Sequence, residues 1–245
     1  MLLEQTITKL NKMKMFGMAK EIARQTTIDE IAQLSFEERF SLLVDMEETS
    51  RENRRLKRLL AEAKLRENAC IEDIDFRSSR GLDRSLVLSL ASCSWIEKYL
   101  NVLLTGPTGA GKTFIACALG NAACRQGHSS FYIRAPRLFS ELKIARADGS
   151  YVKLLNKLAK TKLLIIDDWG ISPLSDSQRN DILEVIEDRY HVRSTIIISQ
   201  IPIDKWHDVI GNPTIADAIL DRITHNAYKI NLKGESMRKT QQLLD

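Results

Sequence analysis

The 245-residue sequence is poor in the residues that mark fibrous, disordered or disulfide-bonded chains. Its 5 prolines and 11 glycines are too few for a collagen-like or low-complexity chain. Its 4 cysteines form no C-x-x-C pair and join no histidine in a metal-ligand cluster. No apolar run approaches the roughly 20 residues of a membrane span, and the N-terminus lacks the apolar stretch of a signal peptide. We therefore expect a cytoplasmic globular protein.

The first part of the chain has a helical character. Up to residue 68 it contains one glycine, Gly17, and no proline, and apolar residues recur at helical spacing. Ser35 and Glu38 form a capping-box pattern that predicts the start of a long helix. The length of the chain allows one well-buried domain and a smaller one. We predict a helical N-terminal domain at 1–68 and a larger domain at 69–245.

Residues 51–66 form a strongly basic segment, with seven basic residues against two acidic ones. Such a run is often no more than a solvated helix face. The alternative is a surface that contacts the phosphate backbone of DNA, because each neutralised phosphate releases condensed counterions. The candidate contacts are Arg51, Arg54, Arg55, Lys57 and Arg58.

From about residue 100 onward, short apolar runs alternate with helical patterns. Strands are predicted at 102–105, 130–133, 163–166, 195–199 and 228–232. Helices are predicted at 112–125, 136–147, 151–159, 177–190 and 214–223. This alternation predicts an α/β domain in which a parallel sheet is covered by helices on both faces.

The segment GPTGAGKT follows the first predicted strand and opens the first of these helices, as the G-x-x-x-x-G-K-[ST] phosphate loop requires. Its backbone amides and the helix N-terminus are suited to bind phosphate oxygens. Lys112 is expected to reach the β- and γ-phosphates of ATP, and the Thr113 hydroxyl to bind Mg²⁺. The predicted nucleotide-binding residues are Gly106, Pro107, Thr108, Gly109, Ala110, Gly111, Lys112 and Thr113.

A second apolar strand ends in the two carboxylates of Asp167 and Asp168. In a parallel sheet this end faces the phosphate site, so Asp167 is predicted to hold Mg²⁺ with Thr113, and Asp168 to act as general base. Ser199 ends another buried strand, where its hydroxyl could orient the attacking water. Arginines at such sites stabilise charge on the transferred phosphoryl group.

Taken in order, the segments GPTGAGKT, LLIIDDWG, TIIISQ, ILDRITHNAYKI and KGESMR resemble the AAA+ ATPases of the IstB and DnaC group. The similarity is greatest to IstB-like transposition helpers, and the junction SRGLDRSLVLSLASCSWI shares it. It covers nearly the whole chain. The resemblance implies an AAA+ P-loop core with a five-stranded parallel sheet, together with a small all-helical N-terminal domain.

The resemblance also implies an activity and its partners. Such a protein is an ATPase that assembles with ATP as a homo-oligomer on double-stranded DNA, with little sequence preference. It then recruits or stimulates the transposase of an insertion element. Lys143, Arg146 and Lys153 become further candidate DNA contacts.

The same resemblance assigns roles in hydrolysis. Ser199 corresponds to sensor one, Arg222 to an arginine finger that acts across a subunit boundary, and Arg238 to the sensor-two arginine. On spacing alone, each arginine is more simply explained as a surface residue. Asp168 stands where most AAA+ proteins have glutamate, which leaves a carboxylate one methylene shorter.

Two other functions fit parts of this pattern. A DnaC-type replicative helicase loader would share the ATPase core, but its N-terminal domain would bind a helicase. A small-molecule or nucleotide kinase would share only the phosphate loop, and the sequence shows no lid or second substrate pocket of the kind that kinases add.

Overall fold

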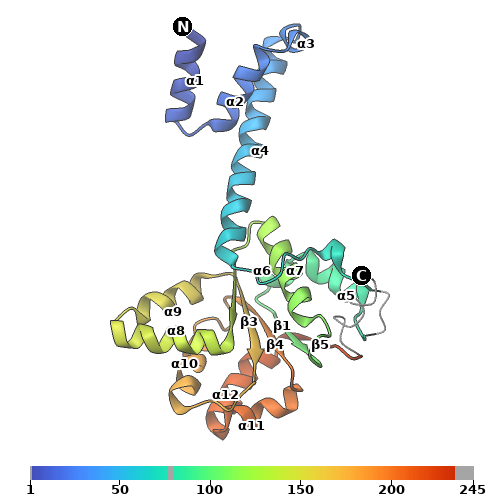
Figure 1. The fold of residues 1–245 in the computed structure, drawn as a ribbon, viewed down its shortest axis with the longest axis vertical. Coiled ribbons are helices and arrows are strands. Elements are labelled where there is room, and N and C mark those ends of the chain that lie inside the picture. The colour runs from blue at the N-terminus through green and yellow to red at the C-terminus, as the bar shows by residue number, and fades with distance from the viewer. Residues whose placement is uncertain (1, 77–79, 235–245) are drawn as a thin grey trace, which may run out of the picture. The chain divides into compact units, whose positions relative to one another are not determined.

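The structure is a computed structural model that describes residues 2–76 and 80–234 (Figure 1). The chain divides into two compact units, residues 1–58 and 59–245. Within the described ranges, none of the helices has the length and apolar character needed to cross a bilayer. Arg238, the predicted sensor-two residue, lies outside the described residues.

The first unit is all helical, as predicted. The helices are α1 (Leu2–Lys12), α2 (Phe16–Gln25), α3 (Asp29–Ala32) and α4 (Phe36–Ala63). The capping box before α4 is formed: the Ser35 amide donates to Glu38 Oε2 at 2.8 Å, and the Glu38 amide donates to Ser35 Oγ at 3.2 Å. Because α4 runs across the division between the units, the domain boundary at residue 68 stays a prediction.

Glu47 fastens α2 to α4. Its buried carboxylate accepts hydrogen bonds from the Gly17 amide at 2.7 Å and the Met18 amide at 3.3 Å, at the first turn of α2. Arg51 Nε also donates to it, at 2.7 Å. A carboxylate is favourable there because helix N-termini carry unpaired amides and partial positive charge. Gly17 allows the close approach, since a Cβ at that position would lie 2.4 Å from the Met46 carbonyl oxygen.

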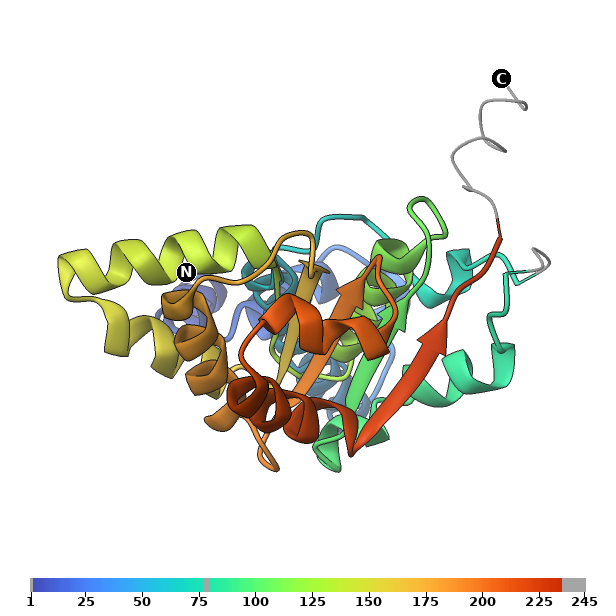
Figure 2. The same cartoon turned by 90° about the horizontal axis from the view of Figure 1, so that it is seen from below.

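The second unit is built on a five-stranded parallel sheet of order β2-β3-β4-β1-β5. The strands are β1 (Asn101–Thr105), β2 (Ser130–Arg134), β3 (Leu163–Trp169), β4 (Ser194–Ser199) and β5 (Ala227–Asn231). Each predicted strand is present, with bounds shifted by no more than a few residues. The prediction of an α/β fold with a parallel five-stranded sheet is confirmed (Figures 1 and 2).

Helices cover both faces of this sheet, as expected for parallel strands. One face carries α5 (Arg84–Ala91), α6 (Ser94–Glu97) and α7 (Lys112–Arg125). The other carries α8 (Ala135–Asp148), α9 (Tyr151–Lys160), α10 (Asp176–Glu187), α11 (Trp206–Ile210) and α12 (Pro213–Thr224). Two 3₁₀ turns, η1 (Ile71–Asp73) and η2 (Ile203–Lys205), complete the unit. Along β1, Val102 and Leu104 pack on the first face and Leu103 on the second, which is the alternation of a pleated strand.

We predict that Glu47→Ala destabilises the packing of α2 on α4 by about 1–3 kcal/mol, because two amides and the Arg51 guanidinium lose a buried partner. Hydrogen exchange of the α2 amides measures this loss. Glu48→Ala, at an exposed position on the same helix, is the control and should leave exchange unchanged.

The contribution of Glu47 should also depend on pH. Burial opposes ionisation, but the hydrogen bonds from Arg51, Met18 and Gly17 outweigh it and lower the pKa of Glu47 below its ordinary value of 4.5. A lowered pKa means that the stabilisation is complete above the ordinary value and is lost as the pH falls through the folded-state pKa. Equal protection of α2 in wild type and Glu47→Ala at neutral pH would contradict this account.

Candidate nucleotide-binding site

The phosphate loop occupies residues 106–113 between β1 and α7. Gly106, Gly109 and Gly111 have φ values of +139°, +82° and +88°, a conformation that disfavours any residue with a Cβ. A Cβ on Gly106 would also lie 2.3 Å from the Leu232 carbonyl oxygen. The loop is thus wrapped tightly against the segment after β5, and α7 begins directly at Lys112.

Lys112 is folded onto the loop. It is 7% exposed, and its Nζ donates to the carbonyl oxygens of Gly106 at 2.7 Å and Pro107 at 2.8 Å. Burial lowers the pKa of the ammonium, while the nearby charges of Asp167 and Asp168 oppose that shift. A cation held this way is well placed to exchange carbonyl oxygens for phosphate oxygens.

Asp167 meets the start of α7. Its Oδ2 accepts from Thr113 Oγ1 at 2.8 Å and from the Tyr132 hydroxyl at 2.7 Å, and the residue is 2% exposed. A hydroxyl and a carboxylate side by side are the oxygen ligands that Mg²⁺ prefers. These two residues therefore fit the predicted metal. Tyr132 also raises the pKa of Arg66, through a hydrogen bond at the end of the basic segment.

Asp168 has an unusual backbone. Its φ is +58°, and its amide donates to Asp167 Oδ1 at 2.7 Å. The pairing of β3 with β4 shifts register between Ile166 and Trp169, so the two aspartates form a bulge. Asp168 Oδ2 is paired with Arg134 Nε at 2.5 Å. Asp168, the predicted general base, therefore departs from regular strand geometry, and its carboxylate is paired with the Arg134 guanidinium.

Ser199 is the last residue of β4 and Gln200 follows it, and the two side chains have different partners. Ser199 is fully buried, and its hydroxyl donates to the Trp169 carbonyl at 2.8 Å and accepts from the Ile201 amide at 3.2 Å. It therefore joins the ends of β3 and β4. Gln200 Oε1 accepts from Thr108 Oγ1 at 2.7 Å, so its side chain contacts the phosphate loop.

Arg222 lies at the amino-terminal end of the parallel strands, whereas the phosphate loop lies at their carboxyl end. Its carbonyl accepts from Asn101 Nδ2 at 3.4 Å, at the first residue of β1, whereas the phosphate loop follows the last. Four strand steps separate these ends, about 13 Å. The guanidinium pairs with Glu187, with Nε at 2.7 Å from Oε2 and Nη2 at 3.0 Å from Oε1. The structure therefore does not bring Arg222 to the phosphate loop of its own chain.

Among the candidate DNA contacts, some already bind other side chains. Arg51 and Arg54 pair with Glu47, at 2.7 Å and 3.3 Å. Arg55, Lys57 and Arg58 are exposed. Arg51 and Arg54 therefore contribute to the packing of α2 on α4 through Glu47, although their side chains are also exposed.

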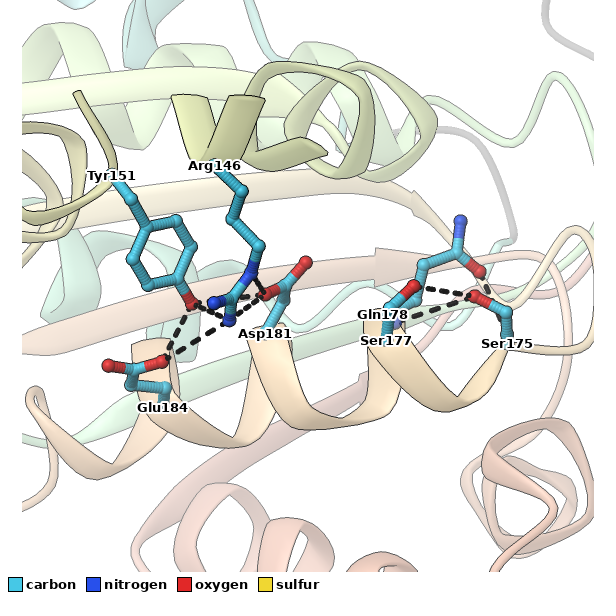
Figure 3. Close-up of polar contacts among 7 residues, drawn as sticks. All are labelled: Arg146, Tyr151, Ser175, Ser177, Gln178, Asp181 and Glu184. Carbon is cyan, nitrogen blue, oxygen red and sulfur yellow. Dashed lines mark hydrogen bonds and ion pairs between the residues drawn. The ribbon is translucent and has the colours of Figure 1, made fainter. Parts of the chain in front are cut away.

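Arg146 is also engaged within the protein. Figure 3 shows its guanidinium and the Tyr151 hydroxyl pointing toward Asp181 and Glu184 on α10, one turn or more from the Ser175 cap of that helix. Arg146 Nη2 lies 2.6 Å from the buried Asp181 Oδ1, and Tyr151 donates to Glu184 Oε2 at 2.6 Å. Lys143 and Lys153, on the same pair of helices, are exposed.

Sequence reasoning did not anticipate Tyr132 and Arg134, which reach the two aspartates. Both lie on β2, which neighbours β3 in the sheet. A polar end on the second strand was visible in the sequence, but the strand order that makes it a neighbour was not. Beyond the Thr113–Asp167 pair, the described residues contain no group of three or more His, Cys, Asp or Glu able to hold a metal.

The parallel sheet of this order, the phosphate loop after its β1 and the paired aspartates after β3 define an AAA+ P-loop ATPase fold. The family of IstB-like ATP-binding proteins matches residues 8–244. The chain belongs to that family, as the sequence pattern indicated. It is 50% identical, over 99% of both chains, to an insertion-sequence ATP-binding protein of Sinorhizobium fredii. It is 49% identical to one of Pseudomonas fluorescens, over 82% of this chain and 88% of the relative.

Solved structures share the fold at lower identity. A crystal structure of DnaI has a TM-score of 0.60 at 23% identity, covering 72% of this chain and 93% of that one. The DnaC helicase loader has a TM-score of 0.58 at 22% identity, covering 68% and 97%. These likenesses support the AAA+ fold of the second unit.

We predict that Gly106→Ala weakens ATP binding about tenfold or more, because the added Cβ meets the Leu232 carbonyl in a backbone conformation that already disfavours it. Titration with a fluorescent ATP analogue measures the affinity. Gly149→Ala is the control: it has a similar positive φ of +78°, but nothing lies within 4 Å of its Cβ. Normal ATP affinity in Gly106→Ala would refute the tight wrapping of the loop.

Proposed function

We propose that this protein is a DNA-binding ATPase that assists transposition: it assembles with ATP on double-stranded target DNA and recruits or stimulates the transposase of its insertion element. The observation that carries this proposal is the match over 99% of both chains to an insertion-sequence ATP-binding protein. The phosphate loop, with Thr113 and Asp167 paired beside it, supports it.

The nucleotide site suggests how hydrolysis proceeds. Thr113 and Asp167 would hold Mg²⁺, which neutralises charge on the β- and γ-phosphates. The amides of the loop bind the phosphate oxygens, and Lys112 moves from the loop carbonyls to the phosphates. Asp168 accepts the proton of the attacking water once its carboxylate leaves Arg134. Gln200, in contact with Thr108, is placed to sense the nucleotide.

Each site is completed by a second subunit. The phosphate loop lies at the carboxyl end of the parallel strands and Arg222 at their amino-terminal end. Arg222 therefore acts at the phosphate loop of a neighbouring copy. To do so, its guanidinium exchanges Glu187 for phosphate oxygens, as charge-assisted bidentate pairs allow. ATP hydrolysis then depends on assembly.

DNA is bound through exposed basic residues. Lys57 and Arg58 on α4, together with Lys143 and Lys153, face solvent and suit contacts to the phosphate backbone, which carry little sequence information. Arg51, Arg54 and Arg146 already form ion pairs. Their replacement would disturb the fold as well as any DNA contact, so they are poor choices for a test.

The test of this function is ATP-dependent assembly on duplex DNA of random sequence, followed by fluorescence anisotropy at several salt concentrations. Wild type should bind with an affinity that falls steeply as salt rises. Lys57→Gln combined with Arg58→Gln should weaken binding and reduce the slope of log affinity against log salt by about 2, since two phosphate contacts are lost.

The control for this test removes the same charge elsewhere. Lys160→Gln combined with Lys205→Gln changes two exposed lysines outside α4 and should leave the slope unchanged. Binding to single strands only, or an equal effect of both double variants, would overturn the proposed use of α4.

We predict that Arg222→Ala retains ATP binding but loses turnover by roughly 10³-fold, the usual effect of removing an arginine finger. Mixed oligomers with Lys112→Ala should regain part of the activity, because that subunit supplies an intact Arg222 to a neighbour with an intact loop. Steady-state phosphate release measures both. Glu187→Ala breaks the same ion pair but keeps the arginine, and should remain active; failure of the mixed oligomers would exclude a finger acting between subunits.

A further inference from the structure

Arg80 lies beside the phosphate loop, in the segment that precedes α5. Its side chain is 6% exposed, and its guanidinium joins two main-chain carbonyls. Nη1 donates to the Ala110 oxygen at 3.3 Å, and Nη2 donates to the Asp75 oxygen at 2.8 Å. Nε has no hydrogen-bond partner among the described residues. A buried cation is thus bonded to the backbone of the loop itself.

The carbonyl that Arg80 holds belongs to the same peptide group as the Gly111 amide. In a trans peptide, the C=O and N–H bonds point in opposite directions. A guanidinium that fixes the Ala110 oxygen therefore also fixes the direction of the Gly111 N–H, which points away from Arg80. The amides of this loop are the groups that cradle the α- and β-phosphates of a bound nucleotide.

The contact with Arg80 requires a glycine at position 111. Its φ is +88°, and a Cβ added to it would lie 2.6 Å from Arg80 Nη1, closer than side chains tolerate. The backbone of Arg80 is held as well, because its carbonyl accepts from the Lys233 amide at 2.8 Å. The backbone that carries the guanidinium is therefore held in place. Any larger residue at position 111 would displace the guanidinium.

We propose that Arg80 is a positioning residue of the nucleotide site: it holds the Ala110–Gly111 peptide so that the Gly111 amide faces the phosphates of a nucleoside di- or triphosphate. This inference rests on ATP binding at the loop. The two cations of the site have different tasks. Lys112 reaches the terminal phosphates with its own ammonium, whereas Arg80 acts through the backbone on the inner ones. Loss of Arg80 should therefore weaken ADP and ATP binding by the same factor.

The experiment compares Arg80→Met with wild type by titration with fluorescent ATP and ADP, well below the melting temperature of both proteins. We expect both dissociation constants to rise about tenfold or more, as for the loss of a hydrogen bond to a charged group. Arg84→Met is the matched control, since Arg84 is exposed, lies four residues further on at the start of α5, and has its Cζ 5.8 Å from the centre of the Phe76 ring. It should bind both nucleotides as wild type does.

The outcomes separate positioning from simple structural support. A purely structural Arg80 would lower the melting temperature without nucleotide and leave the affinity of the folded protein unchanged, which would overturn the inference. If Arg80→Met does not fold, Arg80→Lys replaces it: one ammonium cannot span both carbonyls, so weaker binding is still expected and unchanged binding is decisive against it. If wild type binds no ATP, the proposed function fails as well. If wild type and the Arg80 variants bind ATP equally well, this inference alone fails.

Discussion

The hydrogen bond between Thr113 and Asp167 is the constraint on which the ATPase unit depends. It joins the first turn of α7 to the end of β3, although β4 lies between β3 and β1 in the sheet. Parallel strands bring their carboxyl ends to the same side of the sheet, and the phosphate loop after β1 places the start of α7 within reach of the end of β3. Tyr132 supports the same carboxylate from the other side. The sheet thus fixes a hydroxyl and a carboxylate side by side.

The two units are stabilised by different means. The ATPase unit has apolar cores on both faces of its sheet. In the described part of the first unit, Ala19 is the one buried apolar side chain, while Phe16, Phe36, Phe40 and Val44 are exposed. Small units bury too little apolar surface to be very stable. The polar contacts of Glu47 therefore carry an unusual share of the stability of this unit.

Much of this arrangement could be predicted because it depends on local patterns. Strands and helices follow from apolar periodicity, the capping box at Ser35 from two residues, and the loop at 106–113 from a motif whose glycines allow positive φ. Contacts that depend on strand order could not be predicted, and these include Tyr132 and Arg134 beside the aspartates. Arg146 shows a further limit: its charge suggested a DNA contact, but the buried carboxylate of Asp181 that binds it lies 35 residues away in sequence. Charge can be counted from the sequence, whereas its partners depend on the fold.

The left-handed backbone at Asp168 bears on the choice of amino acid there. Aspartate and asparagine adopt this left-handed conformation several-fold more often than other residues with a Cβ. For those other residues the conformation costs about 1–2 kcal/mol. The bulge after Ile166 thus favours the shorter acid for reasons of backbone energy, independent of chemistry. Substitution by glutamate would lengthen the side chain and also push the main chain back toward a regular strand. In this family member, the identity of the residue at position 168 and the shape of the strand that carries it depend on each other.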